Sequence, residues 1–228
     1  MPGLPKFLRD IRFHIFYGLV QKRGYHLVTL GDQSYGLQWT ICPDGLSAHS
    51  VVYSGGAGED VSFEHALVKR VGCSIVLCDP SPTGLKTMSL PKNKLSQIQF
   101  LPMALARKAG KLKMAPPPAG DVSWHAQVDA SAELEVPCSD LGTLMAQFGH
   151  SHIDLLKLDI EGCEYEVIDD ILERRIPVRQ ICVEFHHGIV PGVRRSQTIR
   201  SILKLLGHGY KLVCRDCANH TFVFGAST

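Results

Sequence analysis

The spacing of hydrophobic positions changes along the chain and divides it into two regions. In residues 1–45, apolar side chains first recur at helical spacing, which predicts one amphipathic helix, and two short apolar runs at residues 25–30 and 36–41 then predict strands. From residue 46 onward, short apolar runs alternate with segments that are apolar on one helical face. We therefore expect a small N-terminal helix and strand extension over residues 1–45 and one domain over residues 46–228.

The alternation after residue 46 indicates the class of fold. Unbroken apolar runs such as Cys73–Cys78 are typical of a parallel sheet covered on both faces, and repeated strand–helix–strand units predict a doubly wound α/β sheet. The last two strands are joined by a tight connection, so they should be antiparallel. The expected strands cover residues 51–53, 73–78, 97–101, 153–158, 180–185, 210–214 and 221–224.

Residues 107–120 interrupt this pattern with a basic segment that ends in three consecutive prolines. We expect an exposed hairpin or loop inserted between elements of the sheet. A solvated face explains the charge, and attraction of an anionic substrate is the alternative. The basic residues are Arg107, Lys108, Lys111 and Lys113.

Composition narrows the classes of function. The chain has 228 residues, 45% of them hydrophobic, which is enough for a substantial core. A formal net charge of +2 argues against a protein whose main work is binding nucleic acid, so a small molecule or a glycan is the expected partner, and a homo-oligomer is compatible with the sequence. The apolar run at residues 13–20 is far shorter than the roughly 20 residues of a membrane span, so no transmembrane segment is expected.

The eight cysteines do not indicate a disulfide framework. Most stand singly inside apolar runs, where a free thiol behaves as a small hydrophobic group. The first residues lack the pattern of a secretory signal, so we expect reduced thiols and a cytoplasmic protein. Cys214 and Cys217 form a single CxxC pair, which we interpret as structural because zinc sites of this kind need a second pair.

Two polar features at strand ends indicate a nucleoside-containing ligand. Gly55, Gly56 and Gly58 follow the first strand of the domain and allow close approach of the backbone to a ligand. Asp79 ends the next strand, about twenty residues further on, where a carboxylate can accept hydrogen bonds from both hydroxyls of a ribose. The alternative is that Asp79 and Pro80 form only a turn.

Two later strands end in acids and a histidine. Asp159 and Glu161 follow one strand, and Glu184 and His186 end the next. Such groups at a ligand-binding edge are costly unless they are paired or functional. Glu161 and Glu164 have a second interpretation, since acids in a first helical turn complement the helix dipole. The combination could also hold a divalent metal, although no tight ligand spacing supports that interpretation.

The residues Lys157–Glu164 resemble the K-x-D-x-E-G-x-E signature of FkbM-type S-adenosylmethionine-dependent methyltransferases. Tyr53–Glu64, Asp79–Pro82 and the Glu184-x-His186 pair are similar to three further motifs of that family, and the resemblance covers residues 36–190. It implies a Rossmann-like class I methyltransferase fold, with a seven-stranded, mostly parallel sheet whose last strand is antiparallel. It also implies S-adenosylmethionine as cofactor and O-methylation of a hydroxyl on a sugar, glycan or other small metabolite.

The resemblance also implies roles for individual residues. It places Asp159 near the methionine end of the cofactor, and His186 or Glu184 near the acceptor. Tyr53 departs from the family, most members of which have an acid there, and Trp39 either covers the site or is an ordinary core residue. The catalytic set is Asp159, Glu161, Glu184 and His186; the cofactor set is Tyr53, Gly55, Gly56, Gly58, Glu59, Asp60, Ser62, Asp79, Pro80, Ala104 and Asp159; no metal ligand is assigned.

Two other functions stay open at this point. One is a non-catalytic S-adenosylmethionine-binding partner subunit, although a chain without activity would be expected to lose the polar cluster. The other is a metal-dependent hydrolase that uses Asp159, Glu161, Glu184 and His186.

Overall fold

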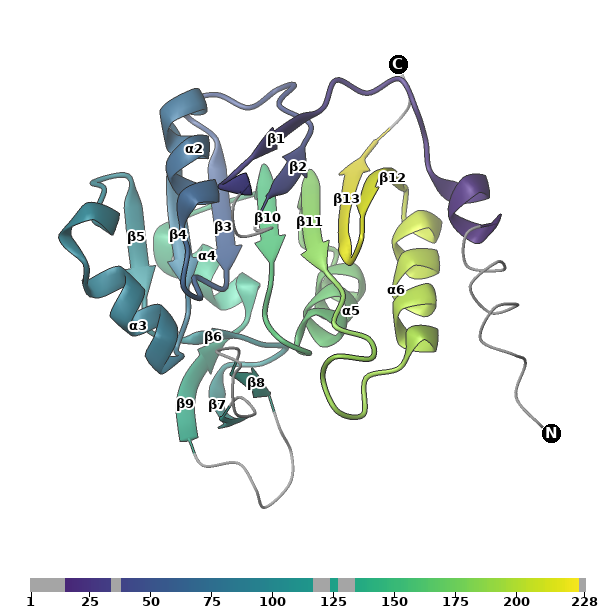
Figure 1. The fold of residues 1–228 in the computed structure, drawn as a ribbon. Helices are drawn as coiled ribbons and strands as arrows, with labels where there is room; N and C mark the ends of the chain where they lie inside the picture. The colour runs from purple at the N-terminus through teal and green to yellow at the C-terminus, as the bar shows by residue number, and fades with distance from the viewer. Residues whose placement is uncertain (1–14, 34–37, 117–123, 127–133, 226–228) are drawn as a thin grey trace.

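A seven-stranded sheet forms the centre of the molecule. The computed structural model describes residues 15–33, 38–116, 124–126 and 134–225. The strands of the sheet are β3 (Val51–Gly55), β4 (Ser74–Cys78), β5 (Ile98–Leu101), β10 (Leu155–Leu158), β11 (Gln180–Glu184), β12 (Tyr210–Asp216) and β13 (Asn219–Phe224). Their order is β12-β13-β11-β10-β3-β4-β5 (Figure 1). The strands β3, β4, β5, β10 and β11 pair in parallel, and β13 is antiparallel to both of its neighbours, which confirms the predicted fold class.

Helices cover both faces of this sheet because its strands are apolar on both faces. In β4, Ile75 and Leu77 pack in one core cluster and Val76 and Cys78 in another, as the alternation of side chains along a strand requires. The first cluster includes α2 (Ser62–Val71) and α3 (Pro82–Ser89), and the second includes α4 (Leu141–Phe148), α5 (Glu164–Arg174) and α6 (Arg195–Gly207). A short 3-10 turn, η2 (Pro91–Asn93), follows α3. The result is a three-layer domain.

The N-terminal extension packs against the sheet. Residues 15–20 are helical, and β1 (Val28–Leu30) pairs with β2 (Trp39–Ile41) as an antiparallel hairpin. The Tyr17 hydroxyl lies 2.6 Å from Nε2 of His220, and the Gln180 side chain bonds both the N–H and the carbonyl of Cys42. The extension therefore contributes to the core, although the predicted helix before residue 15 lies outside the described residues.

A second, smaller sheet follows β5 and includes the described part of the segment 107–120, for which the sequence predicted an exposed hairpin or loop; residues 117–120 lie outside the described residues. Its strands are β6 (Ala104–Leu105), β7 (Gly110–Ala115), β8 (His125–Ala126) and β9 (Leu134–Ser139), in the order β6-β9-β7-β8. The strand β7 pairs antiparallel with β8 and β9, which agrees with a hairpin, but the expected exposure was wrong for its end: Met114 packs on Val136 and Cys138 of β9 and makes one face of the basic segment apolar. This sheet lies below the carboxyl ends of the central strands (Figure 1).

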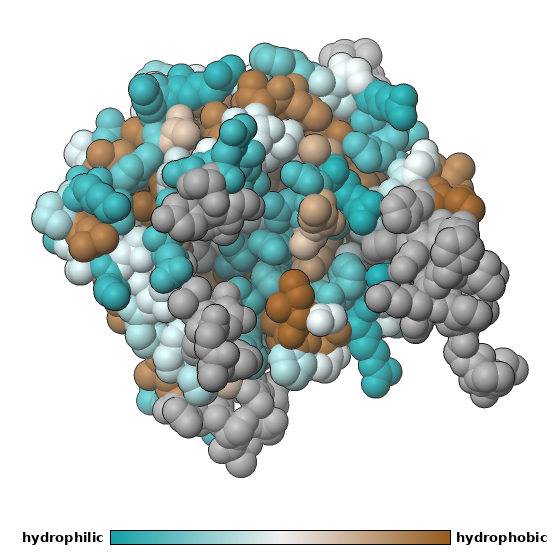
Figure 2. Space-filling model, viewed as in Figure 1, coloured by the Kyte–Doolittle hydropathy of each residue, from teal (hydrophilic) through white to brown (hydrophobic). Residues whose placement is uncertain are grey.

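The surface shown in Figure 2 is mostly hydrophilic, with separate apolar groups rather than one continuous apolar patch. Within the described ranges, the structure contains no helix that is both long and apolar enough to cross a membrane.

Candidate functional site

A cavity opens where the chain order of the strands reverses. The chain runs outward from β3 through β4 to β5 and returns to β10 on the other side of β3, and ligands bind at such a reversal, beyond the carboxyl ends of the strands. The cavity there measures about 500 Å³. That volume falls within the range of roughly 300–1,000 Å³ that is usual for small-molecule sites.

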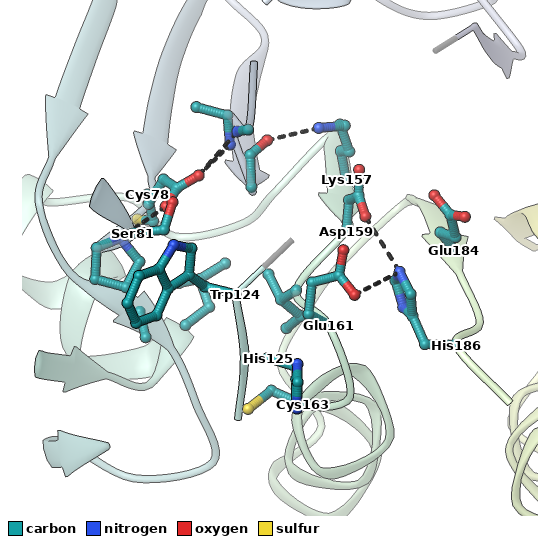
Figure 3. A pocket seen from close by; sticks show the side chains of 18 of the residues that line it. Cys78, Ser81, Trp124, His125, Lys157, Asp159, Glu161, Cys163, Glu184 and His186 are labelled. Carbon is teal, nitrogen blue, oxygen red and sulfur yellow. Dashed lines mark hydrogen bonds and ion pairs between the residues drawn. The ribbon is translucent and has the colours of Figure 1, made fainter. Parts of the chain in front are cut away.

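The cavity brings together most of the residues predicted from the sequence. The turn after β3 and the end of β4 form one part of its wall, and the segments after β10 and β11 form another (Figure 3). All four residues of the predicted catalytic set line it. From the predicted cofactor set, the lining residues are Gly56, Gly58, Glu59, Asp60, Asp79, Pro80, Ala104 and Asp159.

Three residues of the predicted cofactor set lie outside the lining that the described residues form. Tyr53 is fully buried in the core, and its hydroxyl lies 2.9 Å from Nδ1 of His150. Gly55 lies within β3, where its carbonyl accepts a hydrogen bond from the backbone N–H of Asp159. Ser62 begins α2 and is bonded to Asp60 instead. Alternation along β3 explains Tyr53, since its side chain faces the α4 and α5 layer.

The turn after β3 depends on glycine at one position in particular. Gly56 has a φ of +91°, and a Cβ there would lie 2.0 Å from the backbone carbonyl oxygen of Asp159. A side chain at this position would therefore both strain the backbone and force β3 away from the loop after β10. Glycine lets the two strand ends meet at the floor of the cavity.

Asp79 holds this turn against the end of β4. One carboxylate oxygen accepts the backbone N–H groups of Ala57 and Gly58 at 2.8 and 2.9 Å, and the other accepts that of Ser81 at 2.7 Å. A carboxylate has roughly four acceptor positions, so three are occupied by the backbone. Asp79 therefore holds the turn in addition to its expected contact with a ribose, which stays a prediction.

A buried ion pair that was not predicted from the sequence supports the same turn. The Lys157 ammonium lies 3.5 Å from Oε1 of Glu64 and donates a 2.7 Å hydrogen bond to the carbonyl of Gly56. The Ser54 hydroxyl donates to Glu64 at 2.6 Å, and the Lys157 ammonium lies 5.2 Å from the centre of the Trp39 ring. Burial lowers the pKa of Lys157, but the charge of Glu64 and other nearby carboxylates outweighs burial and raises it. Lys157 therefore keeps its positive charge at neutral pH.

A signal for this pair exists in the sequence. Lys157 interrupts an otherwise apolar strand, and Glu64 stands beside Phe63 on the apolar face of a helix. A charge at a buried position requires a partner, so each residue indicates that the other kind of charge is nearby.

His186, just beyond β11, is the centre of an acidic cluster. It is 3% exposed, and its Nδ1 and backbone N lie 3.3 and 3.1 Å from the same oxygen of Glu164. The other oxygen of Glu164 accepts the N–H of Gly162 at 2.8 Å. Nε2 of His186 lies 3.5 Å from Asp159 and 3.4 Å from Glu161. Glu164 is therefore more than an acid that complements a helix dipole, since it fixes the orientation of the imidazole.

The cluster carries more negative than positive charge. Burial and the neighbouring charge of Asp159 raise the pKa of Glu184 to about 7. Burial lowers the pKa of His186, but the hydrogen bond and charge of Glu164, with the charges of Glu161 and Asp159, raise it to about 10. Ligand atoms of Asp159, Glu184 and His186 lie within 4.8 Å of one another, so these three could hold a metal ion. The cluster as a whole is suited to a positively charged group.

Aromatic residues complete the cavity. Trp39 lines it from the N-terminal extension, and Trp124 and His125 line it from the smaller sheet. In the view of Figure 3, Trp124 is drawn on the same side of the cavity as Cys78 and Ser81, and Glu184 and His186 are drawn on the other side. Trp39 was a candidate from the sequence, but the other two carry no sequence signal, because the contact of the smaller sheet with the cavity is a tertiary one.

Comparison with known proteins finds a family and relatives whose sequences match most of the chain. The family described as methyltransferase FkbM domain matches residues 48–212. Probable methyltransferase-like protein 24 of Rattus norvegicus is 27% identical over 187 residues, which cover 73% of this chain and 43% of the relative. The Homo sapiens protein of that name is 26% identical over 186 residues, 73% of this chain and 42% of the relative. The chain thus spans less than half the length of these two relatives.

Among solved structures, the precorrin-6y C5,15-methyltransferase from Geobacter metallireducens GS-15 is similar, with a TM-score of 0.43 and 14% sequence identity. The match covers 78% of this chain and 82% of that one.

Proposed function

The chain belongs to the family of FkbM methyltransferase domains, and from this premise we propose that it transfers a methyl group from S-adenosylmethionine to a hydroxyl of a sugar, glycan or other small metabolite. One observation carries the proposal. The glycine turn with Asp79 and the acidic cluster around His186 line a single cavity at the reversal point of the sheet.

The residues of the cavity fit the cofactor. Gly56 and Gly58 leave the backbone open to close approach, and the carboxylate of Asp79 lines the cavity beside them. Asp159 lines the cavity beside the other acids, where a positively charged sulfonium or ammonium group would be stabilised. When bound, S-adenosylmethionine supplies an activated methyl group on a positively charged sulfur.

The acceptor hydroxyl would lie at the acidic end of the cavity. Its oxygen must lose a proton as the bond to the methyl carbon forms and the bond from that carbon to sulfur breaks. A carboxylate of the cluster can take the proton, and a positioned base typically contributes about 10²–10⁴-fold to the rate. Holding the two reactants in attack geometry can contribute a further 7–11 kcal/mol or so.

The same acids support a neutral or cationic acceptor. Asp159, Glu161 and Glu184 all line the cavity, and their charges would repel the phosphates of a nucleic acid. A hydroxyl-rich metabolite or glycan instead offers donors that carboxylates can accept. This is consistent with the small net charge of +2.

Isothermal titration calorimetry with S-adenosylhomocysteine tests the cofactor assignment. Asp79→Ala removes the charged hydrogen bonds that shape the turn, each worth roughly 1.5–3 kcal/mol, so affinity should fall about 10–100-fold. Asp216→Ala, an exposed acid at the edge of the sheet, is the matched control and should bind as the native chain does. The proposal fails if the native chain binds neither S-adenosylhomocysteine nor S-adenosylmethionine.

A further inference from the structure

We propose that Asp159, Glu184 and His186 bind a divalent cation at the acceptor end of the cavity. One ligand atom from each lies within 4.8 Å of the others. The three residues end or follow the adjacent parallel strands β10 and β11, which pair from Leu156↔Ile181 to Leu158↔Val183. The sheet itself therefore fixes the backbone that carries the three ligands.

The distances from Nε2 of His186 to the neighbouring carboxylates are compatible with an ion held between them. Nε2 of His186 lies 3.5 Å from Asp159 and 3.4 Å from Glu161. A charge-assisted N–H···O hydrogen bond would close to about 2.7–2.9 Å. Ligands about 2.1 Å from a tetrahedral ion lie roughly 3.4 Å apart, and opposite ligands of an octahedral ion lie roughly 4.2 Å apart. Small side-chain adjustments bring all three ligand atoms within reach of one ion.

The orientation of His186 is a separate observation that indicates a ligand. The imidazole is 3% exposed, and Nδ1 lies 3.3 Å from Oε1 of Glu164, whose side chain is fully buried. A carboxylate that holds one ring nitrogen in this way is the usual second partner of a metal-binding histidine. The other nitrogen, Nε2, is then presented toward the carboxylates that line the cavity.

The charge balance also favours a cation. Asp159, Glu161 and Glu184 line the acceptor end, and the ammonium of Lys157, which also lines the cavity, is already paired with Glu64 at 3.5 Å. One imidazole cannot balance three carboxylates. Carboxylate and imidazole ligands together suit Mn²⁺ and similar ions.

The role of the cation rests on the proposed function. A cation at this site would hold the acceptor oxygen and lower the pKa of its hydroxyl, as a Lewis acid does. Glu161 is not one of the three ligands; its carboxylate lines the cavity 3.4 Å from Nε2 of His186, and in this proposal it takes the hydroxyl proton. An acceptor with two adjacent oxygens, such as a vicinal diol of a sugar, could chelate the ion, so we infer that class of substrate.

Manganese binding to the metal-stripped full chain tests the site without reference to methyl transfer. Electron paramagnetic resonance measures the concentration of free Mn²⁺. We choose this ion because it prefers oxygen and nitrogen ligands and therefore binds weakly to free thiols such as Cys163 in the cavity wall. We expect one bound Mn²⁺ per chain, an affinity at least 10-fold weaker in Glu184→Gln, and one 10–100-fold weaker in Glu164→Gln. Glu166→Gln changes an exposed acid of the same helical turn and should bind Mn²⁺ as the native chain does.

The outcomes separate this inference from the proposed function. Absence of Mn²⁺ binding, or binding that Glu184→Gln and His186→Gln leave unchanged in chains that stay folded by circular dichroism, overturns the metal site. Methyl transfer that proceeds fully in excess EDTA overturns the role of the cation while the proposed function stands. Mn²⁺ binding that is lost in Glu184→Gln, in a chain that binds no S-adenosylhomocysteine, supports the site and contradicts the proposed function.

Discussion

The buried pair of Glu64 and Lys157 allows a quantitative prediction. Their side chains are 1% and 4% exposed, and Lys157 also donates to the Gly56 carbonyl. Glu64→Gln keeps the shape of the side chain but leaves the ammonium buried without its nearest carboxylate. Breaking a buried pair in this way typically costs about 3–5 kcal/mol. Since Asp159 still attracts the ammonium, we expect the lower end, about 3 kcal/mol.

Urea unfolding followed by circular dichroism measures this cost. The control is Glu173→Gln, which breaks the surface pair of Glu173 with Arg107, where the two side chains are 57% and 36% exposed. Exposed pairs contribute about 0–1 kcal/mol, so the control should be close to the native chain.

A double-mutant cycle separates the pair from its surroundings. Lys157→Met removes the other charge, and the double variant should lose about 1–3 kcal/mol less than the sum of the two single variants. The reasoning is refuted if Glu64→Gln costs no more than the surface control, or if the cycle shows no coupling energy.

Three further predictions follow from single contacts. Burial lowers the pKa of His220 to about 3, so between about pH 6.5 and pH 3 the unfolded chain binds a proton that the folded chain does not. The free energy of unfolding should then fall by up to about 1.4 kcal/mol for each pH unit of acidification. In His220→Gln, urea unfolding at several pH values should show a slope of this free energy against pH that is smaller by up to that amount. Gly56→Ala places a Cβ 2.0 Å from the Asp159 carbonyl oxygen and should abolish S-adenosylhomocysteine binding by calorimetry. Gly149→Ala, which has nothing within 4 Å and lies away from the cavity lining, should keep binding and cost only about 1–2 kcal/mol of stability. Asp140→Ala removes the N-cap of α4 and should lower the free energy of unfolding by about 1–2 kcal/mol.

For each of these three predictions, one experimental result would contradict the reasoning. Parallel pH profiles for the native chain and His220→Gln would show that the histidine does not titrate differently on unfolding. Equal binding by the two glycine variants would mean that the close approach at Gly56 does not shape the cavity. Loss of stability in Ser139→Ala but not in Asp140→Ala would move the helix cap by one residue.

The main sheet could be predicted from the sequence because its signals are local. The apolar run of β4 is buried on both faces, and Gly72 and Gly149 take the left-handed conformation that ends their helices. The smaller sheet could not be predicted, since β6 and β8 are two residues long and β9 contains Pro137. The cap of α4 shows the limit at one residue: Ser139 and Asp140 are both residue types that cap helices, and in the structure the Asp140 side chain accepts the N–H of Thr143.

In the candidate site, too, residues with a local sequence signal could be predicted, and residues placed by tertiary packing could not. Asp79, Asp159 and His186 could be located from the sequence, because ligands of such sheets bind beyond the carboxyl ends of the strands. Tyr53 was assigned to the cofactor set because it stands near the end of β3. Side chains alternate along a strand, however, and that of Tyr53 packs against the helices instead of lining the cavity. Trp124 came without any signal, because its contact with the cavity depends on how the smaller sheet packs.

The central claim is methyl transfer to a hydroxyl group, and one measurement addresses it directly. The full chain is incubated with S-adenosylmethionine that carries a radiolabelled methyl group and with a fractionated pool of small metabolites and glycans. We predict label in a hydroxyl-bearing fraction that survives mild alkali, as a methyl ether does and a methyl ester does not, and no label with Asp159→Asn. Label that appears only in nucleic acid, or that alkali releases, or that the native chain fails to transfer, would contradict the account.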